Sequence, residues 1–109
     1  MARVLGVDPG VRVFAAAALD AGAVVFAASV DLAAAPRAQW ARVVDAYIRL
    51  AAPDLVVVEA QNMRFGPCAF VEGLVHGAAA ARGIPCVQHV PRQMHGACPG
   101  FGGHRANKK

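Results

Sequence analysis

Two short apolar runs that each end in a carboxylate constrain the fold of this chain more than any other feature. Residues 3–7 are followed by Asp8 in a Val-Asp-Pro-Gly turn, and residues 55–58 are followed by Glu59. Runs of this length rich in Val favour strands, and the unbroken run at 55–58 is typical of a strand buried on both faces. We therefore expect two neighbouring strands with an acid at each carboxyl end. Gly10 is expected to take a positive φ in the turn after Asp8 and to let backbone approach a ligand.

Two more strands are predicted between these runs. Residues 11–19 and 23–30 are apolar and flank a turn at residues 20–22, which predicts an antiparallel meander. Residues 84–90 predict a last strand, closed by Pro91.

Helical periodicity predicts two helices. The first begins near Pro36, and its apolar face comprises Trp40, Val43, Val44, Tyr47, Ile48 and Ala51. The second opens at Pro67 and stops at Gly83, with apolar rows of Phe70, Leu74 and Ala78 beside Val71, Val75 and Ala79. Parallel strands joined by helices, with a hairpin at one side, make a mixed α/β sheet. Ligands of such sheets gather outside the carboxyl ends of the parallel strands, where Asp8 and Glu59 would lie.

Length and charge limit the functional classes. A chain of 109 residues fits one domain, and its net charge is +4. Every charged residue after Gly73 is positive, which suits a polyanionic partner such as nucleic acid or forms a solvated basic tail. The three cysteines have no disulfide-framework spacing and are expected to be free thiols. Asp20 interrupts the apolar stretch 13–30, so we expect no membrane span and an intracellular, soluble protein.

The paired acids predict a metal site. An Asp and a Glu at adjacent strand ends suit Mg²⁺ or Mn²⁺, which prefer oxygen ligands completed by water and substrate phosphate. In the alternative interpretation, Asp8 caps a turn and Glu59 forms a salt bridge with Arg64.

Three motifs in order resemble those of the RuvC-like Holliday junction resolvases. They are Val-Leu-Gly-Val-Asp-Pro-Gly at 4–10, Val-Val-Val-Glu-Ala-Gln-Asn-Met-Arg at 56–64 and Gly-Ile-Pro-Cys-Val-Gln-His-Val-Pro-Arg-Gln at 83–93. The chain is most similar to the poxvirus-type and mitochondrial branch of the RNase H-like superfamily. The resemblance implies an RNase H-like mixed sheet with flanking helices and a homodimeric endonuclease that cuts four-way DNA junctions with Mg²⁺ or Mn²⁺. It also implies that Asp8 and Glu59 are the catalytic metal ligands, with Gln61 in the Glu-x-Gln context of the viral branch.

The chain departs from the family pattern in one respect. The family takes two further acids from a C-terminal helix, whereas residues 73–109 contain no Asp or Glu. Residues 105–109 resemble the basic segment before that helix, so we expect a single domain, 1–109, that lacks the C-terminal catalytic helix. Loss of catalysis, or ligands supplied by another chain, are the alternatives.

Basic residues in the loop after Glu59 and towards the C-terminus are the candidates for phosphate contact. They are Arg64, Arg92, Arg105, Lys108 and Lys109. Phe65 and Phe101 are candidates for a junction wedge, with packing as the alternative.

A second metal hypothesis concerns zinc. Its donors would be Cys86, His89, His95, Cys98 and His104. Cys86 and His89 lie three apart on a predicted strand and should therefore point to opposite faces, which argues against zinc. His95 or His104 could alternatively replace a missing carboxylate.

Two other functions are open alternatives to the junction nuclease. A non-catalytic nucleic-acid-binding domain would keep the fold and the basic end without a full metal site. An actin-like nucleotide-binding domain would use the Asp-Pro-Gly turn for phosphates, but the chain lacks a second Gly-rich phosphate loop.

Overall fold

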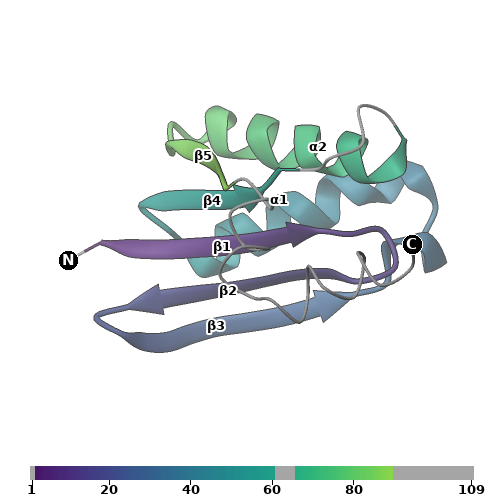
Figure 1. The fold of residues 1–109 in the computed structure, drawn as a ribbon. Helices are drawn as coiled ribbons and strands as arrows, with labels where there is room; N and C mark the ends of the chain where they lie inside the picture. The colour runs from purple at the N-terminus through teal and green to yellow at the C-terminus, as the bar shows by residue number, and fades with distance from the viewer. Residues whose placement is uncertain (1, 61–65, 90–109) are drawn as a thin grey trace, which may run out of the picture.

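The computed structural model describes residues 2–60 and 66–89, which form one mixed sheet covered by helices. Strands β1 (Arg3–Pro9), β2 (Phe14–Asp20) and β3 (Ala23–Val30) form an antiparallel meander. Strands β4 (Leu55–Glu59) and β5 (Cys86–His89) continue the sheet parallel to β1, in the order β3-β2-β1-β4-β5 (Figure 1). The predicted mixed α/β sheet is confirmed.

The turn between β2 and β3 explains how the meander forms. Asp20 pairs with Ala23, which leaves only Ala21 and Gly22 in the loop. Their φ angles are 54° and 82°, and a two-residue hairpin loop with both φ values positive matches the right-handed twist of its strands. The alanine-rich stretch is therefore a hairpin and not the helix that alanine alone favours.

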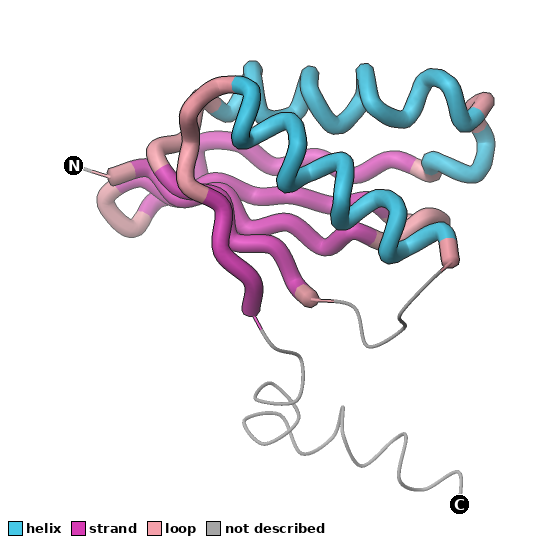
Figure 2. The backbone as a smooth tube through the Cα atoms, turned by 90° about the horizontal axis from the view of Figure 1, so that it is seen from above, coloured by secondary structure: helices cyan, strands magenta, loops and turns pink. Residues whose placement is uncertain are grey.

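Both α-helices cover the same face of the sheet. Helix α1 (Trp40–Ala51) follows two 3-10 turns, η1 (Leu32–Ala34) and η2 (Arg37–Gln39), while α2 (Pro67–Ala81) joins β4 to β5. Figure 2 shows the two helices side by side above the strands. Alternate residues of β1, β2 and β4 point into this layer and are buried; they include Leu5, Val7, Phe14, Ala16, Ala18, Val56 and Val58.

The predicted apolar face of α1 is confirmed. Trp40, Val44, Ile48 and Ala51 are buried, and Val43 and Tyr47 pack against the same core. The helix ends at Ala52, which takes a left-handed conformation ahead of Pro53. Arg82 donates to both carboxylate oxygens of Asp45 at 2.8 Å and so links α1 to the end of α2.

Two details differ from the sequence predictions. In α2 the buried row is Val71, Val75 and Ala79, whereas Phe70 is 44% exposed, because its ring lies beside Trp40 of α1. In β4, Val56 and Val58 are fully buried, but Leu55 and Val57 are only half-buried. The prediction of a strand buried on both faces is therefore wrong for the described residues, since both helices lie on one side.

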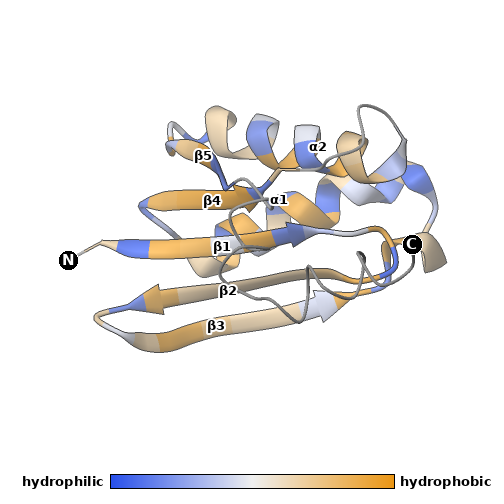
Figure 3. Ribbon diagram, in the orientation of Figure 1, coloured by the Kyte–Doolittle hydropathy of each residue, from blue (hydrophilic) through white to orange (hydrophobic). Residues whose placement is uncertain are grey.

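The opposite face of the sheet is not covered by either helix. In Figure 3 the strands are coloured mainly as hydrophobic. Within residues 2–60 and 66–89, no helix has the length and apolar character that crossing a bilayer requires.

Candidate active site

Asp8 and Glu59 lie on neighbouring parallel strands. The ladder between β1 and β4 ends with the pair Val7 and Val58, and the two acids are the next residues of their strands. Since Val7 and Val58 point into the helix-covered core, the alternation of side chains directs both acids to the open face. The two candidate metal ligands therefore share one face of the sheet.

The two strands lose their mutual pairing at this point. Beyond Val7, β1 remains paired with β2 through Asp8 and Ala15, while β4 remains paired with β5 through Glu59 and His89. The pairing between β1 and β4 stops just before the two carboxylates. This is the kind of position, outside the carboxyl ends of parallel strands, where α/β sheets bind ligands.

A shallow pocket of about 560 Å³ extends from Asp8 across the open face. Its walls come from β1, β2 and β3 and consist of small residues, namely Gly6, Asp8, Ala15, Ala16, Ala17, Ala27, Ala28 and Ser29. Large side chains at these positions would fill the space beside the carboxylate. Desolvation by partial burial raises the pKa of Asp8 above its ordinary value.

Gly10 has a role that differs from the predicted one. Among the described glycines, positive φ angles occur at Gly22, Gly66 and Gly83, so the expectation of a positive φ at Gly10 is wrong. A Cβ at Gly10 would instead lie 2.5 Å from the carbonyl oxygen of Val13. The glycine is required because the backbone of the turn after Asp8 passes too close for any side chain.

His89 of β5 lies beside Glu59, on the side of β4 that is away from β1. The two residues are paired in the β4–β5 ladder, and the backbone N–H of Ala60 donates to the carbonyl of His89 at 2.8 Å. Cys86 lies half-buried against the core, whereas His89 is exposed on the other face of β5, as the spacing predicted. The remaining three donors of the zinc hypothesis, His95, Cys98 and His104, lie outside the described residues.

The carboxylates of Asp8 and Glu59 are the type of ligand that a hard divalent cation prefers, but they are only two. Two carboxylates from adjacent strands offer the oxygen atoms that Mg²⁺ and Mn²⁺ prefer. Among residues 2–60 and 66–89, no group of three or more His, Cys, Asp or Glu side chains is arranged to hold a metal ion. Water and substrate phosphate would have to complete the coordination.

The five basic residues predicted to contact DNA, Arg64, Arg92, Arg105, Lys108 and Lys109, all lie outside the described residues. The same holds for Phe65 and Phe101.

The sequence analysis did not predict a polar cluster formed by Glu72, His76 and Gln88. Glu72, only 9% exposed, accepts a hydrogen bond from the side-chain amide of Gln88 and lies 3.5 Å from Nε2 of His76. Desolvation by burial and the charge of Glu72 together raise the pKa of Cys86. The i,i+4 spacing of Glu72 and His76 on a helix was the available signal, but their contact with β5 is a tertiary feature.

Comparison with solved structures identifies the fold. The chain is similar to Thermus thermophilus RuvC, solved in complex with a Holliday junction substrate, with a TM-score of 0.74. The chain has an RNase H-like fold. That match has 20% sequence identity and covers 89% of this chain and 70% of the RuvC chain.

Two further solved structures are similar to this chain. The Fowlpox virus resolvase, solved with Holliday junction DNA, gives a TM-score of 0.65 at 19% identity and covers 82% of this chain and 60% of its own. The nuclease domain of the large terminase subunit gp2 of bacterial virus Sf6, solved with manganese, gives 0.55 at 17% identity over 83% of this chain and 38% of that chain. At these identities the likeness establishes the fold. No protein-family model matches the sequence, and comparison with curated proteins finds no significant match.

Proposed function

We propose that this RNase H-like domain is a metal-dependent endonuclease that hydrolyses phosphodiester bonds in four-way DNA junctions. The observation that carries the proposal is the position of Asp8 and Glu59, which directly follow the last pair of the β1–β4 ladder on the open face. The folds of two resolvases solved with junction DNA support the same substrate class.

In this proposal Asp8 and Glu59 hold Mg²⁺ or Mn²⁺ through their carboxylate oxygens. A divalent cation bound there would supply Lewis-acid activation of a water and stabilise the charge that develops on the phosphate. The small residues beside Asp8, such as Gly6 and Ala17, leave space for a nucleic-acid backbone next to the carboxylate. The family resemblance further suggests a homodimer in which each protomer makes one of two paired incisions.

The second candidate function is non-catalytic binding of nucleic acid. It is favoured by the sequence after Glu72, which contains no Asp or Glu, and by the lack of a third suitably placed donor among the described residues. Such a domain would bind DNA through its basic residues with an affinity that falls as salt rises.

The experiment compares three forms of the 109-residue chain on a synthetic four-way DNA junction with Mg²⁺ or Mn²⁺. These are the unmodified protein, Asp8→Asn and Asp54→Asn. Asp54 is a matched control because it lies at the opposite end of the same strand pair, where its carboxylate accepts from the backbone N–H of Arg3. Cleavage is measured by gel electrophoresis, and Mn²⁺ binding by electron paramagnetic resonance.

We expect Asp8→Asn to abolish cleavage and weaken Mn²⁺ binding while DNA binding persists, and Asp54→Asn to retain all three. Cleavage that is unchanged by Asp8→Asn would overturn the role of Asp8. Salt-sensitive DNA binding by the unmodified protein without any cleavage would select the non-catalytic function.

A further inference from the structure

Arg37 packs against two adjoining aromatic rings. Its guanidinium carbon lies 4.9 Å from the ring centroid of Trp40 and 5.4 Å from that of Phe70. The two rings are themselves in contact, with centroids 6.2 Å apart. Trp40 is only 4% exposed and its Nε1 donates to the carbonyl of Ala35 at 3.1 Å, so one of the two rings is fixed in the core.

Arg37 and its two rings lie at the end of the sheet where the two acids are. The backbone N–H groups of Leu32 and Ala33 both donate to the carbonyl of Val11, which ties the segment before Arg37 to the turn that follows Asp8. Phe70 is in the first turn of α2, the helix that comes after β4 and Glu59. Figure 1 shows the tips of β1 and β3 and the start of α2 at this same end of the molecule.

The charge of Arg37 is not neutralised within the described residues. Arg3 pairs with Asp20 and Arg82 with Asp45, whereas no described carboxylate forms an ion pair with Arg37. Packing of a guanidinium against aromatic rings leaves its in-plane N–H donors available for other partners. Arg37 is exposed, so these donors can be reached from solvent.

The 44% exposure of Phe70 also fits this interpretation. Its ring is one of the two against which Arg37 packs, and no described carboxylate forms an ion pair with that cation. Restraining the side chain in advance lowers the entropy lost when it binds an anion. A planar guanidinium held in this way is suited to the two oxygens of a phosphodiester.

We propose that Arg37, packed against Trp40 and Phe70, contacts a backbone phosphate of the nucleic acid bound at this end of the sheet. The inference rests on the proposed function, because it takes DNA as the ligand, but it adds a contact that the motif-based candidates did not include. It assigns Phe70 the role of positioning Arg37.

The test measures binding of a fluorescein-labelled four-way DNA junction to the 109-residue chain by anisotropy, in EDTA, across about 50 to 200 mM NaCl. The variants are Arg37→Gln, Arg37→Lys and Phe70→Leu. Arg49→Gln is the matched control, since Arg49 is an exposed arginine in the last turn of the same helical segment and its loss changes the net charge equally. Circular dichroism melting checks that each variant folds.

We expect Arg37→Gln to weaken binding about 5- to 10-fold at the lower salt and to reduce the slope of log affinity against log salt by about one. Arg37→Lys should keep the slope but lose affinity, because lysine retains the charge but lacks the planar guanidinium that packs against the rings. Phe70→Leu should lose affinity without a change in slope, and Arg49→Gln should change neither quantity.

Equal effects of Arg37→Gln and Arg49→Gln would overturn the proposal, because they would reduce it to net charge. Absence of DNA binding by the unmodified protein would also overturn it. Since no divalent cation is present, failure of the proposed cleavage chemistry would not alter these results and would appear only in the Asp8→Asn experiment.

Discussion

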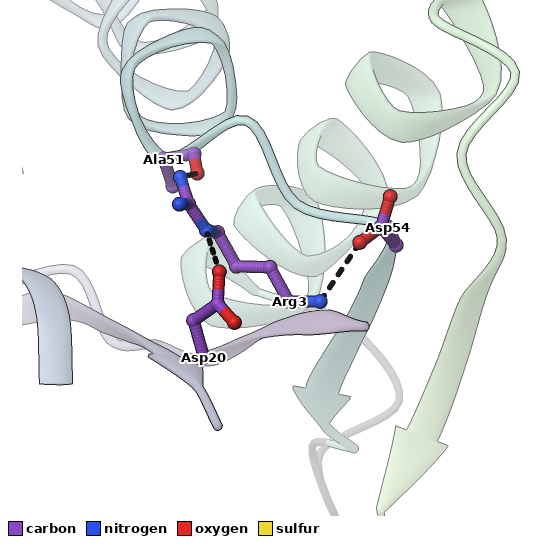
Figure 4. Close-up of polar contacts among 4 residues, drawn as sticks. All are labelled: Arg3, Asp20, Ala51 and Asp54. Atoms are coloured by element: carbon purple, nitrogen blue, oxygen red, sulfur yellow. Dashed lines mark hydrogen bonds and ion pairs between the residues drawn. The ribbon is translucent and has the colours of Figure 1, made fainter. Parts of the chain in front are cut away.

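Arg3 and Asp54 are joined by two reciprocal hydrogen bonds at the start of the β1–β4 pair. The backbone N–H of Arg3 donates to a carboxylate oxygen of Asp54 at 2.8 Å, and the backbone N–H of Asp54 donates to the carbonyl of Arg3 at 2.8 Å. Figure 4 shows Arg3 at the centre of this cluster, with its side chain directed to Asp20 and to the carbonyl of Ala51. Asp8 lies five residues after Arg3 and Glu59 five after Asp54, so this contact has the same register as the ladder that brings the two acids to the same level.

Asp54→Ala should therefore destabilise the protein. We expect the free energy of unfolding to fall by about 0.5 to 1.5 kcal/mol, as for loss of one typical hydrogen bond. Asp54→Asn, which retains an acceptor oxygen, should lose less than half of that. Urea denaturation followed by circular dichroism measures both, and equal losses in the two variants would contradict a role for the acceptor.

The turn after Asp8 should not tolerate a side chain at Gly10. Gly10→Ala would place a Cβ 2.5 Å from the carbonyl oxygen of Val13, so we expect a loss of about 1 to 3 kcal/mol in the free energy of unfolding. Gly6→Ala is the control, because its nearest non-neighbouring atom would be 3.9 Å away. Thermal melting measures the stability of the two variants, and a stable Gly10→Ala protein would show that the turn can open.

The apolar face of α1 should dominate the stability of the helix layer. Ile48 is 1% exposed, and Ile48→Ala should cost about 2 to 5 kcal/mol because it leaves a cavity in the core. Leu50, two residues away, is 62% exposed, and Leu50→Ala should change the free energy of unfolding by less than about 0.5 kcal/mol. Similar values for the two substitutions, measured by chemical denaturation, would be inconsistent with the described packing.

The raised pKa of Asp8 predicts a pH-dependent cost to stability. Its folded-state pKa lies above the ordinary value of 3.8, so the folded protein binds this proton more tightly than the unfolded chain does. Stability should then decrease as pH rises through this range, and in EDTA at neutral pH Asp8→Asn should be more stable than the unmodified protein. The difference should vanish as the pH falls below 3.8.

Addition of Mn²⁺ at neutral pH should make the unmodified protein more stable than Asp8→Asn. The unmodified protein gains stability by binding the cation, whereas Asp8→Asn gains little. Thermal melting with and without Mn²⁺ measures the reversal. An identical Mn²⁺ response in both proteins would exclude Asp8 from the metal site.

The thiol of Cys86 should react slowly with iodoacetamide at mildly alkaline pH. Burial and the nearby charge of Glu72 raise its pKa and so lower the fraction of reactive thiolate. Glu72→Gln removes the charge and should speed alkylation, whereas Asp31→Asn, which changes a distant surface acid, should not. Mass spectrometry of the Cys86 peptide follows the rate, after melting curves show that both variants are folded.

Local patterns in the sequence determined most of the elements. The strand bounds Ala23–Val30 and the start of α2 at Pro67 were predicted as observed, because hairpin turns and helix-opening prolines act within a few residues. The first helix was placed too early, since residues 37–39 form a 3-10 turn and α1 begins at Trp40. The last strand was predicted to begin at residue 84. Instead, the backbone N–H of Ile84 donates to the carbonyl of Ala79 in α2, and β5 begins at Cys86.

The order of residues along the chain was enough to put Asp8 and Glu59 at strand ends, because each acid closes an apolar run of its own. Only the tertiary structure decided that β1 and β4 are adjacent and in a register that directs both acids to the uncovered face. The packing of Arg37 against its two rings and the contact between Glu72 and Gln88 could not be predicted from the sequence either. Both join residues from different elements, and periodicity reports which face of its own element a side chain occupies but not which distant residue meets it there.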